Sequence, residues 1–526
     1  MRKNLLLTLT LIVGGIRLGA ESWPVLGSQP AAIGGSFVGM AKGPLGQFWN
    51  PAGLAQENNI SGLSIPVGGR FELTGGILKD AYNISNIAAK YDAIQTAQTS
   101  SGAINADQMA AFLQGVVALD SLNKPGKGFL IDVGGGLGVK IGRFALMVNQ
   151  YTEVGATPFV DIKNIGLGAI SAGSGGVNFA AISNGDPADA TNLASANQIE
   201  TAINTIGFAS VANMICGAAT CPGISSPNEL SNALVNQATA TSTTAEIANA
   251  AQLIADNAAA AGPIIAAIVN GNNNPYTNNA SNLTLRGASF TEIALGMGHQ
   301  LLLPGLYVGA NIKAIQGTVG YHKFQVLDKE ADVGDLVKDF DRSKKDSIQP
   351  GLDVGVFYDL NKTLPVLPMR PRVGLMARNI NSPEFDQPDV AKQNGESSKY
   401  RLDSQVRFGA SFSPFNFWTL AADIDVTENK TPVKGFKSRM LAAGTEINVF
   451  NKSWLNIPLR AGINKNIAES KSKAAYTGGL GLNFLHVHVD LGGSISSETE
   501  KYKDKNGKTQ DVPANASAHA NISILF

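Results

Sequence analysis

The sequence predicts an all-β membrane barrel of about 14 antiparallel strands, with helical insertions in the loops on one side. Three observations lead to this fold class. The chain starts with an export signal. From about residue 58, apolar and polar side chains alternate with period two, as they do in a strand with two different faces. The segments between these strands are alternately short and long, which is typical of outer-membrane barrels.

Residues 1–20 have the composition of a secretory signal peptide. The basic pair Arg2-Lys3 precedes the apolar run 5–13, and small residues close the segment at Ala20. The apolar run is too short to cross a bilayer as an anchor. We therefore expect cleavage after Ala20 and a location outside the cytoplasm; a buried N-terminal helix is the alternative.

The alternation defines fourteen segments of strand length. In 405–413, for example, every second residue is apolar, and the residues between are polar or glycine. Boundaries predicted from such patterns carry an error of a few residues. The predicted strands are 58–77, 128–141, 143–151, 285–300, 305–321, 346–358, 370–380, 400–413, 417–427, 438–449, 456–465, 475–484, 486–497 and 512–526.

A soluble β-sandwich also alternates, so the connections and the last strand decide between the two folds. Connections after even-numbered strands are brief, such as Gly142 and Leu485, and those after odd-numbered strands are long. The chain ends on an apolar strand face that closes with Phe526, which resembles the signal that barrel-assembly machinery reads. A closed barrel leaves no unpaired strand edge in lipid. We expect a bacterial outer-membrane location, with membrane lipid and the assembly machinery as partners.

The overall composition excludes other protein classes. The 526 residues include 41 basic and 41 acidic side chains, and only 16% are charged. A net charge of zero without a basic domain argues against nucleic-acid binding. An apolar content of 44% argues against intrinsic disorder.

Two loops are much longer than turns. The first, 78–127, has helical periodicity, and we interpret it as a lid whose apolar side chains contact a ligand. The second, 152–284, has no lysine or arginine between Asn164 and Leu285, and it is helical in pattern near 245–268. Disorder is the competing interpretation for 270–282. The predicted lid contacts are Ile87, Tyr91, Phe112, Leu113 and Val116.

Candidate metal and disulfide sites are few. Cys216 and Cys221 lie close together, and in an exported protein they are expected to form a disulfide. His486, His488 and Asp490 have the spacing of metal ligands on one strand face, but polar lumen residues are the favoured interpretation. We therefore predict no metal and no cofactor.

The segment after the signal carries the most specific motif. The runs Gly34–Val38 and Phe48–Leu54 resemble the N-terminal signature of the long-chain fatty-acid transporter superfamily of outer-membrane proteins. Within it, the chain is most similar to the TraF-like branch, which is named for conjugal transfer. The resemblance extends through Leu122–Gly126 into Gly134–Leu137, and through Gly374–Phe385, but it does not cover 170–284.

The resemblance implies a 14-stranded barrel, 58–526, whose N-terminal segment 21–57 folds into the lumen as a plug. The residue types support a rigid turn there, because Asn50 can cap the following backbone and Pro51 restricts its own dihedral. Asn50, Pro51, Ala52 and Gly53 are the predicted gating residues. A turn that only leads into the first strand is an equally weighted alternative.

Charged residues on the predicted lumen faces have two interpretations. They can bind an anionic head group of a substrate, or they can pair across the lumen and hold the plug. Pairing is favoured because an unpaired buried charge is costly. These residues are Lys313, Arg372, Arg378, Arg407, Arg460, Glu292, Asp423 and Asp425.

Three function classes follow. Passive uptake of a hydrophobic small molecule is the leading hypothesis, because of the plug motif and the apolar lid. A non-transporting component of a conjugation or secretion assembly is the second. An enzyme is the least favoured, because the sequence has no GxSxG, HExxH or P-loop motif.

Overall fold

The computed structural model describes residues 21–56, 60–84, 96, 102–164, 177–269, 279–325, 340–503 and 508–526. Three sequence-based predictions lie outside these residues. They are the signal peptide 1–20, the lid contacts Ile87 and Tyr91, and the disordered interpretation of 270–278.

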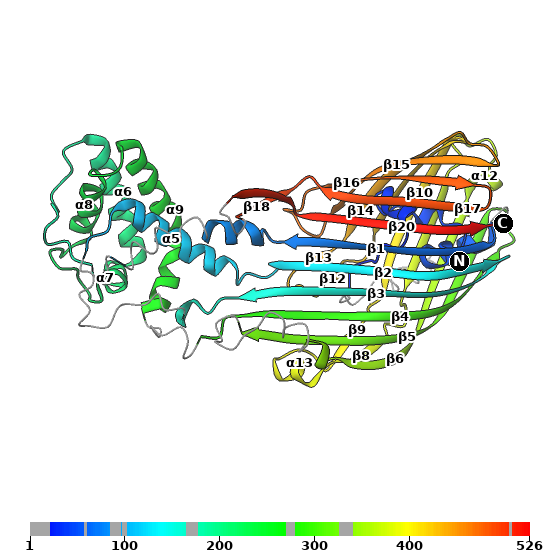
Figure 1. The fold of residues 1–526 in the computed structure, drawn as a ribbon, viewed down its shortest axis with the longest axis horizontal. Helices are drawn as coiled ribbons and strands as arrows, with labels where there is room; N and C mark the ends of the chain where they lie inside the picture. The colour runs from blue at the N-terminus through cyan, green and yellow to red at the C-terminus, as the bar shows by residue number, and fades with distance from the viewer. Residues whose placement is uncertain are drawn as a thin grey trace, which may run out of the picture.

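Fourteen antiparallel strands within the described residues form a closed barrel, as predicted, with β20 pairing with β1 (Figure 1). The barrel strands are β1 (Gly62–Thr74), β2 (Gly128–Ile141), β3 (Phe144–Phe159), β4 (Asn282–Gln300), β5 (Leu306–Gln325), β6 (Lys345–Asp359), β7 (Arg372–Arg378), β10 (Gln405–Phe415), β11 (Trp418–Asp425), β14 (Met440–Val449), β15 (Leu455–Asn466), β16 (Ala475–Phe484), β17 (Val487–Ser496) and β20 (Asn515–Leu525).

Three two-stranded hairpins extend the loops at the end of the barrel where the connections are long. They are β8–β9 (Glu384–Asp386 and Lys399–Arg401), β12–β13 (Asn429–Lys430 and Lys437–Ser438) and β18–β19 (Thr499–Lys503 and Thr509–Pro513). The short turns and the C-terminus lie at the other end (Figure 1). Short turns face the periplasm in outer-membrane barrels, so the hairpins lie on the outside of the cell.

Two strand boundaries differ from the prediction by more than a few residues. β3 continues eight residues past its predicted end at 151, because residues up to Phe159 pair one by one with β4. The eighth barrel strand, β10, begins at Gln405 rather than 400. The preceding residues 399–401 pair with 384–386 instead, in a hairpin that leaves the barrel wall.

The outer surface of the barrel has an apolar belt and an aromatic border. Outward side chains such as Ile65, Leu295 and Leu480 are exposed in the middle of their strands. Aromatic side chains gather beside the short turns, as they do where a barrel leaves the lipid. They are Phe144, Phe415, Phe417, Trp418, Phe450, Trp454, Phe484 and Phe526.

Residues 21–56, which we call the luminal segment, pack inside the barrel (Figure 1). They form four short helical elements around their own apolar cluster, to which the wall adds mainly Met147, Met376 and Ala421. Trp49 is fully buried at the centre and donates a hydrogen bond from its ring nitrogen to the Leu26 carbonyl oxygen, at 2.9 Å. The elements are α2 (Ser28–Ala32), η1 (Val38–Met40), α3 (Gly46–Trp49) and η2 (Pro51–Ala55).

Glycines on the inner face of the wall let the luminal segment approach the strands closely. A Cβ atom on Gly309 would lie 2.3 Å from the carbonyl carbon of Pro51, and one on Gly374 would lie 2.5 Å from the Val38 oxygen. Both distances are shorter than side chains tolerate, so only glycine fits. Other wall glycines in the same position are Gly298, Gly355, Gly409, Gly444, Gly462, Gly479 and Gly492.

The two longest loops combine in one helical head, which stands off the outer end of the barrel (Figure 1). Apolar residues from both loops form a single core. Asn123 joins the head to the barrel, because its side chain both donates to and accepts from the backbone of Val160. The helices are α5 (Ala106–Ser121), α6 (Ala190–Ile206), α7 (Phe208–Cys216), α8 (Pro227–Ala238) and α9 (Thr244–Val269).

Lid contacts predicted from the first loop are core residues of this head. Phe112, Leu113 and Val116 are at most 4% exposed, and they pack against the helices of the second loop. Their assignment as ligand contacts is therefore corrected to a packing role. The apolar periodicity of α5 correctly indicates a buried face, but it does not identify what covers that face.

The helix α9 is long and apolar enough to cross a membrane, by length and composition alone. Its apolar face, which includes Ile247, Ile254 and Ile265, packs into the core of the head.

Replacing Gly309 by alanine should displace the Asn50–Ala52 turn, because the added Cβ collides with backbone atoms on the luminal segment. Overpacking of this kind costs about 1–3 kcal/mol. We expect the heat-induced shift in gel migration to occur at a lower temperature. Gly478→Ala is the matched control, since its nearest contact would be 3.8 Å away. An unchanged transition in Gly309→Ala would contradict this packing.

Acid should weaken the helices of the head. Backbone donors from Ser225 and Thr243 hold the pKa values of Glu229 and Glu246 below their ordinary values. Groups with a lowered folded pKa stabilise the fold above their unfolded pKa, and this contribution is lost as the pH falls through the folded pKa. We expect the helical circular-dichroism signal to become less heat-stable below about pH 4.5. In Glu229→Gln/Glu246→Gln this pH dependence should be smaller.

Candidate functional site

The predicted turn Asn50–Gly53 lies deep in the lumen against β4, β5 and β6. Asn50 is fully buried, and its side-chain oxygen accepts a hydrogen bond from the Ala52 amide at 3.2 Å. Its side-chain nitrogen donates to the Val356 carbonyl oxygen of β6 at 3.0 Å. The side chain thus joins the turn to the barrel wall, a contact that the local motif does not predict.

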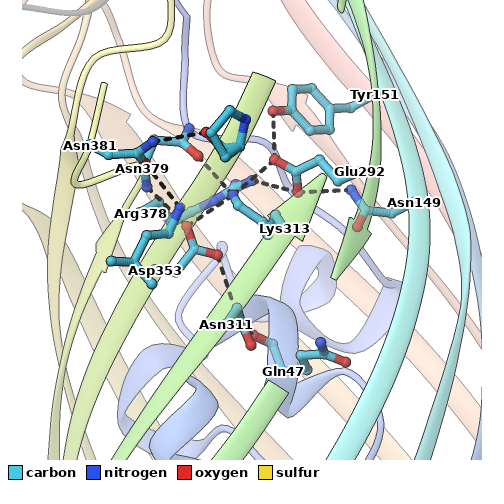
Figure 2. A network of polar contacts seen from close by, with 12 residues as sticks. Gln47, Asn149, Tyr151, Glu292, Asn311, Lys313, Asp353, Arg378, Asn379 and Asn381 are labelled. Carbon is cyan, nitrogen blue, oxygen red and sulfur yellow. Dashed lines mark hydrogen bonds and ion pairs between the residues drawn. The ribbon is translucent and has the colours of Figure 1, made fainter. Parts of the chain in front are cut away.

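A buried ionic network lies beside this turn (Figure 2). The Lys313 ammonium is 3.0 Å from Glu292 and 2.9 Å from Asp353, and all three side chains are at most 4% exposed. It also donates to the side-chain oxygen of Asn379. Arg378 adds a second cation, 3.5 Å from Glu292. Two cations therefore balance two anions.

This network also reaches the luminal segment. Asn311 of β5 donates both to Asp353, at 3.1 Å, and to the backbone oxygen of Gln47, at 3.0 Å (Figure 2). The Gln47 side chain donates in turn to the Ala294 carbonyl oxygen of β4. The network therefore fixes the luminal segment to neighbouring wall strands, rather than presenting a free charge to a ligand.

Two arginines predicted to line the lumen stack on aromatic rings of the luminal segment. The Arg378 guanidinium lies 4.4 Å from the ring centre of Phe48, and that of Arg407 lies 4.5 Å from that of Trp23. Cations in this position are attracted by the ring faces. Arg407 also donates to Asp425 at 2.5 Å. Their charges are thus occupied within the protein.

The other predicted lumen charges lie elsewhere on the wall. Asp423 accepts hydrogen bonds from the backbone amides of Phe37 and Val38, each at 2.9 Å. Arg460 pairs with Glu446 and Asp490 at 2.6 Å. Arg372 lies nearer the short turns, where it donates to Ser413. Asp423 thus contacts the N-terminal segment directly, whereas Arg460 and Arg372 contact other residues of the wall.

The luminal segment separates two hollow spaces. The outer luminal cavity, of about 90 Å³, lies toward the long loops, along β1, β2, β3 and β20. The inner vestibule, of about 470 Å³, lies toward the short turns and is lined mainly by asparagine and charged residues. Each space is large enough for water, since one water molecule needs a cavity of roughly 10–15 Å³.

The outer luminal cavity combines apolar and acidic side chains. Its apolar part includes Trp23, Leu26 and Met440, and its polar part includes Glu21 and Glu153. Ser22 donates to Glu153 from both its amide and its hydroxyl group. Burial and the nearby Glu153 carboxylate raise the pKa of Glu21 well above its ordinary value.

Sequence reasoning missed this acidic group. Glu153 lies past the predicted end of the third strand, so it was counted as a loop residue. Glu21 adjoins the predicted cleavage site and has no motif around it. Extending the period-two pattern of the third strand to 153 would have placed Glu153 on the same face as Tyr151 and the lumen.

The structure also locates the predicted disulfide and the possible metal ligands. Cys216 and Cys221 form a disulfide at the end of α7. His486 lies in the turn before β17, where its ring contacts the Leu525 carbonyl oxygen, so it does not share a strand face with His488 and Asp490. Among the described residues, no three His, Cys, Asp or Glu side chains are grouped as metal ligands.

Removing the central cation of the network should destabilise the barrel. Lys313→Met leaves Glu292 and Asp353 buried next to an apolar side chain, and breaking a buried ion pair costs about 3–5 kcal/mol. Lys399→Met is the control, because its pair with Asp386 is exposed and such pairs contribute about 0–1 kcal/mol. Urea unfolding of both variants measures the difference. Equal losses would contradict the structural role of the network.

Comparison with known proteins gives a family and several similar folds. A family model described as "F plasmid transfer operon, TraF, protein" matches residues 47–425. None of the curated proteins matches the sequence.

Similar solved structures include two toluene transporters and a FadL homologue. The toluene transporter TbuX of Ralstonia pickettii has 11% identity and a TM-score of 0.39, over 95% of this chain and 98% of that chain. The Pseudomonas putida toluene transporter TodX has 10% identity and a TM-score of 0.35, over 97% and 98%. A Pseudomonas aeruginosa FadL homologue has 10% identity and a TM-score of 0.34, over 97% and 98%. Because the family model spans well over half of the sequence, this chain belongs to the family of the F plasmid transfer operon protein TraF.

Proposed function

We propose that this outer-membrane barrel takes up a small hydrophobic molecule passively, and that the luminal segment is its plug. The observation that carries the proposal is the outer luminal cavity. It lies inside the barrel on the outer side of the plug, and apolar side chains, including Trp23, Leu26 and Met440, line it. Pockets that bind small molecules typically have apolar linings with a few placed polar groups.

The cavity volume limits the size of the bound molecule. About 90 Å³ corresponds to several water molecules, since one water needs roughly 10–15 Å³ on the same measure. A compact molecule with one ring fits this space better than a long acyl chain does. The larger inner vestibule is polar, so it supports release into water rather than tight binding of an apolar body.

The hollow spaces on the two sides of the plug suggest where it moves. Hydrogen bonds join the luminal segment to β3 to β6, to β10 and β11, and to β14 to β16. Both hollow spaces extend along the sector where β20 closes on β1. We place the route between them along this sector, past residues 42–45 of the plug.

A reversible cross-link across this sector tests the gating role. A Cβ on Gly138 of β2 would lie 3.6 Å from the Cβ of Pro44, within the range for disulfides. We expect oxidised Pro44→Cys/Gly138→Cys to take up a monocyclic aromatic hydrocarbon at the background rate. The reductant should restore uptake. Uptake of the radiolabelled probe by intact cells measures this, and cells without the protein set the background.

The controls for this experiment are the two single cysteine variants, oxidised in the same way, which should retain uptake. Full uptake by the oxidised double variant would show that the plug need not move on this side. Background uptake by wild-type cells would contradict the transport proposal itself.

The second candidate function is a non-transporting component of a conjugation assembly. Family membership favours it, because the matching model is described as a transfer-operon protein. The helical head also favours it, since it has its own core and projects from the cell surface instead of sealing the lumen. Wild-type uptake at the background rate in the experiment above would favour this candidate.

A further inference from the structure

The outer luminal cavity has more acidic groups than basic ones. The cation Arg70 lines the cavity, but it forms ion pairs with Asp132, at 2.6 Å, and with Glu72, at 3.3 Å. Glu21 and Glu153 have no lysine, arginine or histidine nitrogen within 4.0 Å among the described residues. Arg407, which also lines the cavity, is paired with Asp425.

The network around Lys313 has no such excess, since two cations balance two anions there. Arg460 stands between Glu446 and Asp490, so an acidic excess also occurs elsewhere on the wall. Carboxylates buried without a cation are costly, because they lose hydration without a compensating charge. A bound cation would therefore be favourable in the cavity, where Glu21 and Glu153 form no ion pair.

Glu21 supplies a second and independent observation. Its side chain is 96% buried, since the residue is only 4% exposed, and it lines the cavity. One of its carboxylate oxygens, Oε1, has no hydrogen-bond partner. Buried polar atoms in folded proteins nearly always have a partner, but this oxygen, the Trp23 ring nitrogen and the Oδ1 atom of Asp132 all lack one in this cavity.

The apolar side of the cavity fits the body of the same ligand. Trp23, Leu26 and Met440 lie around the space that Glu21 and Glu153 border. The guanidinium groups of Arg378 and Arg407 already lie over the Trp23 ring. The ring can therefore make apolar contacts with the ligand, but it does not bind the charge of the ligand. The charge of the ligand must then be met by carboxylates.

We propose that the outer luminal cavity binds a protonated amine with a small apolar body. The ammonium group lies between Glu21 and Glu153 and donates to the free Oε1 atom, and the body packs against Trp23, Leu26 and Met440. This inference rests on the proposed uptake function, and it names the class of molecule that is taken up.

An ammonium group can also come from the chain itself. Cleavage after Ala20 would leave an α-ammonium on Glu21, one residue from Ser22, whose amide donates to Glu153 at 3.2 Å. Both sources present an ammonium group to the same carboxylates. The test must therefore distinguish binding of an added amine from occupation of the site by the α-ammonium of Glu21.

The test compares benzylammonium with benzyl alcohol, a neutral molecule of nearly the same shape. Both are titrated calorimetrically into the full mature protein in detergent. We expect benzylammonium to bind at least about tenfold more tightly, because hydrogen bonds to charged groups are stronger than neutral ones. Glu21→Gln should remove about tenfold of the benzylammonium affinity and leave that of benzyl alcohol unchanged.

Matched variants keep the test decisive. Asp511→Asn removes an exposed acid on β19 and should change neither affinity. Heat-modifiable gel migration shows whether each variant has folded, and Glu153→Gln replaces Glu21→Gln if that variant does not assemble. A protein that carries three extra residues before Glu21 moves the α-ammonium away from the cavity.

Each result supports or overturns the proposal. Selective binding of benzylammonium by the mature protein, lost in Glu21→Gln, supports it. Equal affinities for the two probes overturn it, as expected if Glu21 is protonated, but leave the uptake function standing. Binding only in the extended protein overturns it too, because the terminus then fills the site. Binding of neither probe to either protein overturns the inference, and hydrocarbon uptake by intact cells then decides separately on the proposed function.

Discussion

The width of a fourteen-stranded barrel is the constraint on which the rest of this structure depends. The side chains of about eight strands can fill the interior of a barrel, but those of a much wider ring cannot. The luminal segment fills the remaining space here, and it does so with backbone as well as side chains. Wall glycines such as Gly309 and Gly374 follow from this requirement, since the two backbones approach more closely than any Cβ permits.

Filling a lumen with polypeptide also removes polar groups from water, so each of them needs a partner. The partners come mostly from the wall. Asp423 accepts from two backbone amides of the plug, and Asn50 donates to a strand carbonyl group. Around Lys313, two cations balance the two anions that the wall contributes.

The sequence predicts the wall well because the wall repeats a local rule. Alternation with period two and the lengths of the loops determine the strand number, and the closed fourteen-stranded barrel confirms it. Lumen charges such as Arg407 could be assigned to the inner face in the same way. Their partners could not, because pairing with Asp425 or stacking on Trp23 depends on barrel closure and on a distant segment.

The head shows a different reason for a missed prediction. Helical periodicity in α5 indicates an apolar face, but Phe112 and Val116 are covered by helices more than seventy residues away in the chain. In the second loop, small residues are three of the seven buried residues of α6 and five of the nine of α9, and they give weak periodicity. Contacts between two insertions are set by tertiary packing, which no local pattern encodes.

The acidic cavity and the plug share one carboxylate, which connects binding to opening. Ser22, near the start of the luminal segment, donates twice to Glu153, and Glu153 also borders the outer luminal cavity. A cation that takes up the lone pairs of Glu153 competes with both of these bonds. In the proposed binding mode, this competition would loosen the luminal segment at Glu153 of β3, whereas the hydrogen bonds of Asn50 and Asp423 would not be involved. A ligand can shift such an equilibrium only by its differential affinity for the two states. In the proposed binding mode, the difference in affinity between the two states would come from the unpartnered oxygen of Glu21 and from Glu153, which Ser22 also contacts.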